Sequence, residues 1–239
     1  MKKLSMAVAA TSIALAAPGL VAADTFNYAS FKAGATQIRN NGFETDPGTG
    51  NADQVGQVKT RYHSGFNGAL AFGRQYEVES TFDIRAEFEL GLSQAEVKSH
   101  TLTVVDKSDP NVPTTVSSTG LPNPDGDLMM LTGFVSLYGE KELEAIPNTS
   151  FIFGAGGGAA QVEFSDYSAA GAKQIDDEDT SYGFHLTTGW AYHLTDTTSL
   201  EATYRYMSIE DVDLESEAGF SESQRIDSHH FMAGVRVGF

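Results

Sequence analysis

Cysteine is absent from this sequence of 239 residues. A disulfide framework and a metal site with cysteine ligands are therefore excluded. Basic residues are also scarce, because 15 Lys and Arg stand against 32 Asp and Glu, which gives a formal net charge of −17. A chain this acidic repels nucleic acid, so we exclude nucleic acid as a partner, and we expect no cofactor.

Long apolar runs are missing too, apart from one short stretch near the start. Residues 1–23 hold two lysines, an apolar stretch over 4–15 that is too short to span a bilayer, and small residues that end at Ala23. We interpret them as a secretory signal peptide that is removed, which leaves 24–239 as a single domain. No later run of 18 apolar residues follows, and this excludes a helical membrane anchor but not spanning strands.

What the sequence does contain is alternation of apolar and polar residues with a period of two, which predicts half-buried strands. The alternation is clearest in four segments, which are 78–90, 180–194, 200–206 and 230–239. Weaker alternation predicts four more strands, over 26–37, 65–76, 128–140 and 150–163. In the last of these the glycine-rich run 154–160 leaves the facing of the side chains undefined.

The links between these eight strands alternate in length. Short links are predicted at 74–77, 141–149 and 195–198, and long, acidic loops at 38–63, 92–127, 164–179 and 209–227. Short turns on one rim and long loops on the other are typical of outer-membrane barrels. The sequence thus predicts an all-β fold, an eight-stranded antiparallel up-and-down transmembrane β-barrel, with both termini on the periplasmic side.

Aromatic residues favour lipid, rather than a second protein layer, against the apolar strand faces. Many lie near strand ends on those faces, where interfacial girdles would be, and we assign to the girdle Tyr76, Trp190, Tyr192, Tyr204, Tyr206 and Phe239. The charged faces must then point inward, since a charge at the lipid midplane costs roughly 2–4 kcal/mol.

An eight-stranded barrel is just wide enough for side chains to fill its interior. We therefore predict an interior ion-pair network formed by Lys32, Glu79, Asp83, Arg85, Glu87, Glu89, Glu201, Arg205 and Arg236. Arg205 is expected to reach Asp83 or Glu87 across the lumen. The alternative is that these charges line a narrow, porin-like conduit for small solutes.

The closing segment 230–239 resembles the last strand of outer-membrane barrels, because apolar residues occupy every second position up to a terminal aromatic residue. Segments 68–73, 82–88, 154–158 and 202–206 are similar to strands of the small opacity-type, OmpA-like outer membrane protein beta-barrel domain family. The resemblance covers essentially all of 24–239.

This resemblance implies an integral protein of the outer membrane of a Gram-negative bacterium, with a role in envelope integrity and as a surface antigen or adhesin. It also implies an assembly signal in the last strand, made of Phe231, Val235, Val237 and Phe239. The partners it implies are outer-membrane lipids and lipopolysaccharide, the barrel-assembly machinery, periplasmic chaperones in transit, and a host or cell-surface ligand at the loops.

A lipid A-modifying enzyme is a third, less favoured reading, and we assign no catalytic residue. Such enzymes need a Ser, a His and a carboxylate at the barrel surface, and the nearest candidates are His185, His193, His229 and His230 with Ser181, Ser199, Ser208 and Ser228.

The acidic loops are interpreted as a solvated, repulsive surface. A weak Ca²⁺ or Mg²⁺ site is the alternative, with the candidates Asp176, Asp177, Glu178 and Asp179.

Overall fold

The computed structural model describes residues 25–39, 41–45, 54–106, 108, 114–122, 125–169, 172–215 and 221–239. The predicted signal peptide, residues 1–23, lies outside them. Among the described residues, no helix is long and apolar enough to cross a membrane.

The chain forms one antiparallel sheet that closes on itself. Of the eleven strands in the described residues, eight are hydrogen-bonded in a ring, because β1 pairs with β4 on one side and with β11 on the other. The ring consists of β1 (Thr25–Ile38), β4 (Gly65–Glu79), β5 (Phe82–Asp106), β7 (Asp125–Glu142), β8 (Thr149–Ala169), β9 (Ala172–His193), β10 (Thr198–Glu215) and β11 (Ser221–Gly238). The predicted eight-stranded antiparallel barrel is confirmed.

The strands are strongly staggered around the ring. Following paired residues once around the barrel from Tyr28 leads back to β1 at Ile38, a shift of 38 − 28 = 10 residues, through Gly73, Glu87, Ser136, Gly156, His185, Met207 and Ser228. A stagger of this size requires the strands to tilt by roughly 35–45° from the barrel axis. Side chains that face each other across the lumen therefore cannot be found by counting strands alone.

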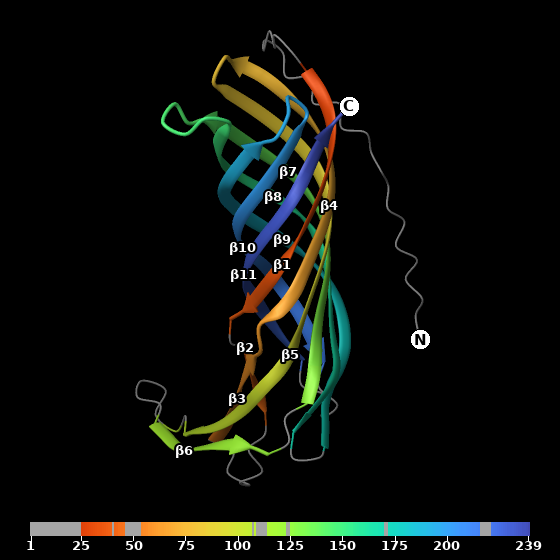
Figure 1. The fold of residues 1–239 in the computed structure, drawn as a ribbon. Helices are drawn as coiled ribbons and strands as arrows, with labels where there is room; N and C mark the ends of the chain where they lie inside the picture. The colour runs from red at the N-terminus through yellow and green to blue at the C-terminus, as the bar shows by residue number, and fades with distance from the viewer. Residues whose placement is uncertain are drawn as a thin grey trace.

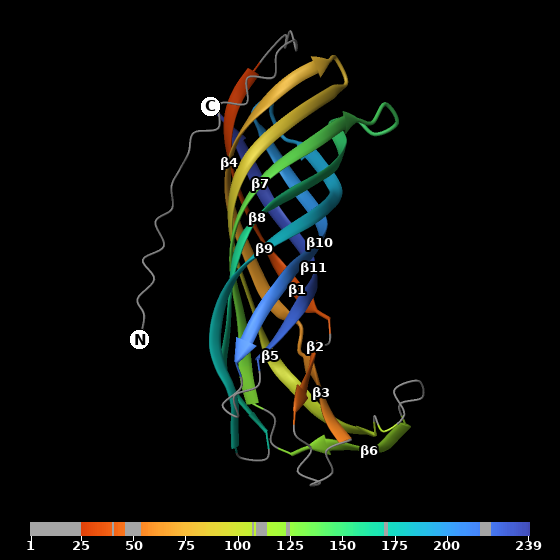
Figure 2. The same ribbon diagram turned by 180° about the vertical axis from the view of Figure 1, so that it is seen from behind.

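The two ends of the barrel differ. β1 begins and β11 ends at the end that carries the short turns, at the top of Figure 1, which we call the short-turn end. At the opposite end, which we call the hairpin end, the ring strands run on and three further strands join them (Figures 1 and 2). These are β2 (Asn41–Thr45), β3 (Gln54–Tyr62) and β6 (Thr114–Leu121), of which β3 and β6 flank the distal half of β5.

The link lengths predicted from the sequence need correction. Much of 38–63, 92–127, 164–179 and 209–227 is strand rather than loop, because ladder pairing continues there, as far as Ala169 with Ala172 in the β8–β9 hairpin. The first short turn lies at Ser80–Thr81 and not at 74–77. Residues 74–77 stay in β4 because Gln75 points into the barrel, where its amide donates to Asp83 at 2.6 Å and accepts from Arg236 at 2.8 Å.

The outer surface of the ring carries an apolar belt over the part of the strands nearer the short-turn end. It is formed by exposed side chains that alternate with buried ones along each strand. Members include Phe31, Phe66, Leu70, Phe72, Phe88, Leu90, Leu92, Leu131, Val135, Leu137, Phe153, Leu186, Trp190, Leu200, Phe231 and Val237. We call this surface the outer belt.

Candidate functional site

The barrel interior beneath the outer belt holds a cluster of charged side chains. They project from five strands, β1, β5, β7, β10 and β11, because inward-facing residues alternate with belt residues. Each is at most 4% exposed, and the ionic cluster comprises Lys32, Arg85, Arg205 and Arg236 with Glu87, Glu89, Glu140 and Glu201. Four positive and four negative groups leave a formal net charge of 4 − 4 = 0, so these charges pair with one another.

Glu201 of β10 joins three cations from three other strands. Its carboxylate lies 3.1 Å from Lys32 Nζ, 2.7 Å from Arg85 Nη1 and 3.2 Å from Arg236 Nε. A carboxylate removed from water is stabilised only by such close, multiple partners. Glu201 therefore ties β1, β5 and β11 to β10 through the lumen.

Glu140 of β7 forms a second junction. Arg236 donates to both of its carboxylate oxygens, at 2.9 and 3.0 Å, and Arg85 Nε lies 3.4 Å away. Such a two-pronged guanidinium–carboxylate pair fixes orientation as well as charge. Glu140 thus links the β7 side of the barrel to β11 and β5.

A third pair closes the cluster toward the hairpin end. Arg205 donates to both oxygens of Glu89, with Nη2 2.8 Å from Oε2, and also to the hydroxyls of Tyr138 and Thr187 at 3.2 and 3.1 Å. Beside it, Glu87 accepts a hydrogen bond from Tyr28 at 2.8 Å.

Most of the network residues predicted from the sequence lie together in this cluster, with two differences. Asp83 is half-buried at the edge of the cluster beside Gln75, and Glu79 is exposed at the end of β4, away from these pairs. The partner of Arg205 is Glu89, not Asp83 or Glu87, because the tilt of the strands shifts the levels that face each other. Glu140 was missed, although it continues the inward alternation of Ser136 and Tyr138.

Glycines on the inner face of β8 make room for bulky neighbours. A Cβ at Gly154 would meet the Tyr138 ring, and one at Gly156 would meet His185 and Ser136. The facing that the sequence left undefined is therefore settled, with Gly154 and Gly156 pointing inward.

The histidines and serines weighed as catalytic candidates are distributed over both faces. His229 lies on the outer face, where its Nδ1 is 2.8 Å from the Tyr204 hydroxyl. Inside the barrel, hydroxyl and imidazole groups form close pairs, which are Ser136 with His185 at 2.9 Å, Ser228 with His230 at 2.9 Å, and His193 with Ser150 and Ser199 at 2.8 and 3.0 Å.

Of the four metal-ligand candidates, the structure describes the side chains of Asp177, Glu178 and Asp179. Among residues whose side chains the structure describes, no group of three or more His, Asp or Glu is arranged to hold a metal ion. Asp179 accepts from the backbone N–H of Asp213 at 2.9 Å, and Glu178 accepts from Gln161 at 3.2 Å. The side chain of Asp176 lies outside the described set.

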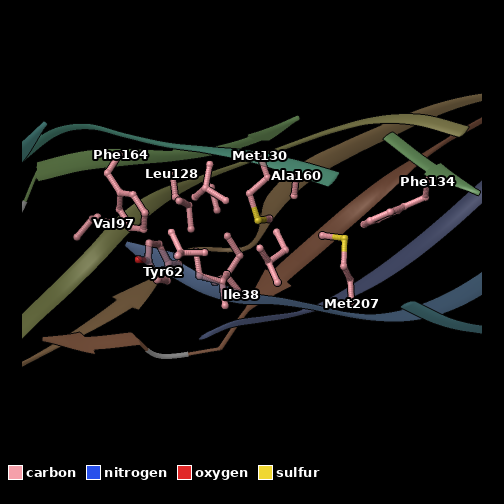
Figure 3. Close-up of a cluster of buried hydrophobic side chains, with 14 residues drawn as sticks. Ile38, Tyr62, Val97, Leu128, Met130, Phe134, Ala160, Phe164 and Met207 are labelled. Carbon is pink, nitrogen blue, oxygen red and sulfur yellow. The ribbon is translucent and has the colours of Figure 1, made fainter. Parts of the chain in front are cut away.

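Toward the hairpin end the lumen is filled by apolar side chains, which we call the apolar cap. Figure 3 shows them packing against one another from opposite walls of the barrel. Its members are Ile38, Tyr62, Ala95, Val97, Leu128, Met130, Phe134, Ala160, Val162, Phe164, Met207, Ile209, Val212 and Ile226. The strands β1, β5, β7, β10 and β11 thus carry ionic residues inward at one level and apolar residues inward at the next.

One wall of the lumen is lined by small residues and buried polar atoms. Both amide atoms of Asn67 and the hydroxyls of Ser30, Thr36 and Thr203 have no hydrogen-bond partner within the described structure. Buried polar groups of this kind are normally satisfied by water. This wall is therefore where water would enter the interior.

The predicted girdle residues occupy two levels on the outer face. Tyr76, Trp190, Tyr192 and Phe239 lie near the ends of their strands at the short-turn end. Tyr204 and Tyr206 lie further along β10, and the hydroxyl of Tyr206 donates to Asp227 at 2.8 Å.

The closed ring, its filled lumen and its outer belt define the chain as a small eight-stranded β-barrel. Solved structures to which it is similar include Neisserial surface protein A, at 17% identity and a TM-score of 0.45, with 90% of this chain and 99% of that chain covered. Ail, the attachment invasion locus protein of Yersinia pestis, is 15% identical with a TM-score of 0.41 over 90% and 99%. Outer membrane protein OprG from Pseudomonas aeruginosa is 14% identical with a TM-score of 0.41 over 90% and 96%. No protein-family model matches the chain, and no curated protein sequence does either.

Proposed function

We propose that residues 24–239 form an integral barrel of the outer membrane of a Gram-negative bacterium, after removal of residues 1–23. The short-turn end, with both termini, faces the periplasm. In this proposal the protein stabilises the envelope, and its ordered hairpin end acts as a surface for recognition, as an antigen or adhesin would. Lipids, lipopolysaccharide and the assembly machinery are its partners, with a cell-surface or host ligand at the hairpin end.

One observation carries this proposal, which is the inversion of side-chain polarity along the strands. On β5, Glu87 and Glu89 point inward while Phe88 and Leu90 point outward. Further along, Ala95 and Val97 point inward while Glu96 and Lys98 are exposed. A barrel wholly in water would bury its apolar residues at both levels, whereas lipid around one level and water around the other favours this reversal.

The filling of the lumen supports a structural role over conduction. The ionic cluster cross-links most of the ring strands through paired charges, and the apolar cap closes the lumen at the next level. Breaking a buried pair leaves an uncompensated charge and costs about 3–5 kcal/mol. Side chains held this firmly favour a rigid plug.

Trp190 provides the direct test, because it is the single tryptophan of the chain and is half exposed on the outer belt. In the full chain reconstituted in phospholipid bilayers, brominated lipids should quench its fluorescence and iodide in the water should not. Bromine near the headgroups should quench more strongly than bromine near the bilayer centre. Efficient quenching by iodide, with none by the lipids, would contradict a membrane-spanning barrel.

A narrow water-filled conduit is the second candidate, and the unpartnered atoms of Asn67, Thr36 and Thr203 favour it. A chain of water molecules along that wall would connect the ionic cluster to the level of the apolar cap. Planar-bilayer recordings separate the two candidates. The plugged barrel should give no discrete conductance steps, and a conduit should give small, reproducible ones.

A further inference from the structure

Exposed charges at the hairpin end are unevenly distributed around the barrel, although Glu96 lies among the basic residues and Arg225 among the acidic ones. Acidic side chains gather on the side of β8 to β10, with Glu178 and Asp213 exposed there. The side of β1, β3 and β5 instead presents four exposed basic residues, which are Arg39, Lys59, Arg61 and Lys98. We call these four the basic patch, and it stands out in a chain with a net charge of −17.

The strand register brings the basic residues together. On β3, Lys59 and Arg61 alternate with the buried Thr60 and Tyr62, so both project outward. Arg61 pairs with Ser99 of β5 and Tyr62 pairs with Val97, which sets Lys98 directly beside Arg61.

Arg39 joins the patch from the link between β1 and β2. Before Arg39, Thr36 pairs with Gly65 of β4, and after it, Asn41 pairs with Thr60 of β3. Because residues 60–65 run alongside this link, Arg39 lies next to the stretch that carries Arg61.

The basic patch lies just beyond the edge of the outer belt. Phe66 and Leu92 are the last exposed apolar residues on β4 and β5 before it, at 56% and 43% exposed. Between belt and patch is a polar row in which Ser64 donates to Gln37 at 3.0 Å. In a membrane-spanning barrel this is the level of the lipid headgroups of the outer leaflet.

The charges of the patch are largely uncommitted within the described residues. Arg39 faces Asp227 at 3.5 Å with its side chain 63% exposed, and the described structure records no ion pair for Lys59, Arg61 or Lys98. By contrast Arg225, on the acidic side, is held by Glu210 at 2.9 Å. Three free cations at headgroup level suit a multiply charged anionic headgroup.

We propose that the basic patch binds the phosphate groups of lipid A in the outer leaflet. This inference rests on the proposed function, because it requires the outer belt to sit in that membrane. Guanidinium and ammonium groups donate to the phosphate oxygens. One side of the barrel thereby acquires a preferred lipid neighbour.

The test measures lipid A binding by the parent chain, by one triple variant of the patch and by one double variant as a control, all in detergent micelles. The probe is diphosphoryl lipid A, with dephosphorylated lipid A as its control. Each cation near an anionic surface contributes enough that Lys59→Gln/Arg61→Gln/Lys98→Gln should weaken binding of the diphosphoryl form on the order of 100-fold. Arg74→Gln/Lys141→Gln, which removes charges at the short-turn end, should leave it unchanged. Binding by the parent should weaken with added salt.

The outcomes separate this inference from the proposed function. Equal binding of diphosphoryl lipid A by the patch variant and the parent, both folded by circular dichroism, would overturn it while the Trp190 quenching result stood. A patch variant that kept lipid A binding and sedimented as a monomer, where the parent sedimented as a dimer, would also overturn it, because the patch would then contact the acidic side of a second copy. Loss of lipid quenching at Trp190 would remove both proposals.

Discussion

Arg205 of β10 and Glu89 of β5 are joined across the lumen by two hydrogen bonds, although 116 residues separate them in the sequence. β5 and β10 are not neighbours in the sheet, so this pair is a side-chain contact that crosses the lumen. The hydroxyls of Tyr138 and Thr187 hold the guanidinium from two further strands. The pair therefore sets the distance between opposite walls of the barrel.

Replacing Arg205 with Ala should lower the unfolding temperature in detergent micelles, because Glu89 is left buried without its cation. The expected loss is about 3–5 kcal/mol of unfolding free energy, and less if water reaches the carboxylate. Adding Glu89→Gln should restore part of the loss, since it removes the stranded charge. An unchanged unfolding temperature together with new conductance steps would instead support the conduit.

Gly156 and Gly157 offer a matched pair of substitutions on β8. A Cβ at Gly156 would collide with Ser136 and His185 inside the barrel, whereas one at Gly157 would meet only a backbone oxygen at 3.5 Å on the outer face. Gly156→Ala should therefore destabilise the barrel by roughly 1–3 kcal/mol, as overpacking does, and Gly157→Ala should be close to neutral. Urea titrations of the two refolded variants measure the difference, and equal stabilities would contradict the inward facing of Gly156.

Deleting Phe239 tests the assembly signal that Phe231, Val235, Val237 and Phe239 are proposed to form. The Phe239 side chain is 75% exposed, so its loss should have little effect on refolding of purified protein in detergent. In cells the deletion should leave the chain unassembled in the periplasm, and Phe239→Tyr should assemble normally. The measurement is heat-modifiable migration of outer-membrane fractions, and normal migration of the deletion would count against the signal.

His100 predicts a pH dependence of the hairpin end. Its Nδ1 lies 2.9 Å from the Thr60 hydroxyl, and burial lowers the pKa of His100 below its ordinary value of 6.5. Below pH 6.5 the unfolded segment takes up a proton that the folded one resists, so the stability of β3 and β5 falls as the pH falls. Limited proteolysis of this region should be faster at pH 5 than at pH 7, once each rate is divided by the rate at which the same protease cleaves an unstructured peptide at that pH. In His100→Asn the ratio between the two pH values should approach one.

Protease added to intact cells tests which end of the barrel faces outward. Cleavage should fall within 92–127 and 209–227, toward the hairpin end, while the turn between β7 and β8 stays protected in the periplasm. Cleavage confined to 141–149 would show that the barrel is inserted the other way round.

Local alternation was sufficient to predict the ring strands and the sign of most interior charges. Arg85, Glu87 and Glu89 face inward, as a period of two with an apolar opposite face predicts for a barrel in lipid. The alternation failed where the environment changes along a strand. Beyond Leu92 the outward side chains become polar and the inward ones apolar, so the sequence predicts loops where the structure continues the strands.

The sequence by itself determined the fold class, the number of ring strands and the charged character of the lumen, since each follows from residues that are neighbours in the chain. Only the tertiary structure decided that Arg205 meets Glu89, that Glu140 completes the ionic cluster, and that Lys98 lies beside Arg61. These contacts depend on the ten-residue stagger of the closed ring and on the bulge at Lys98 in β5. Stagger and bulges arise from pairing between distant segments, and no local pattern encodes them.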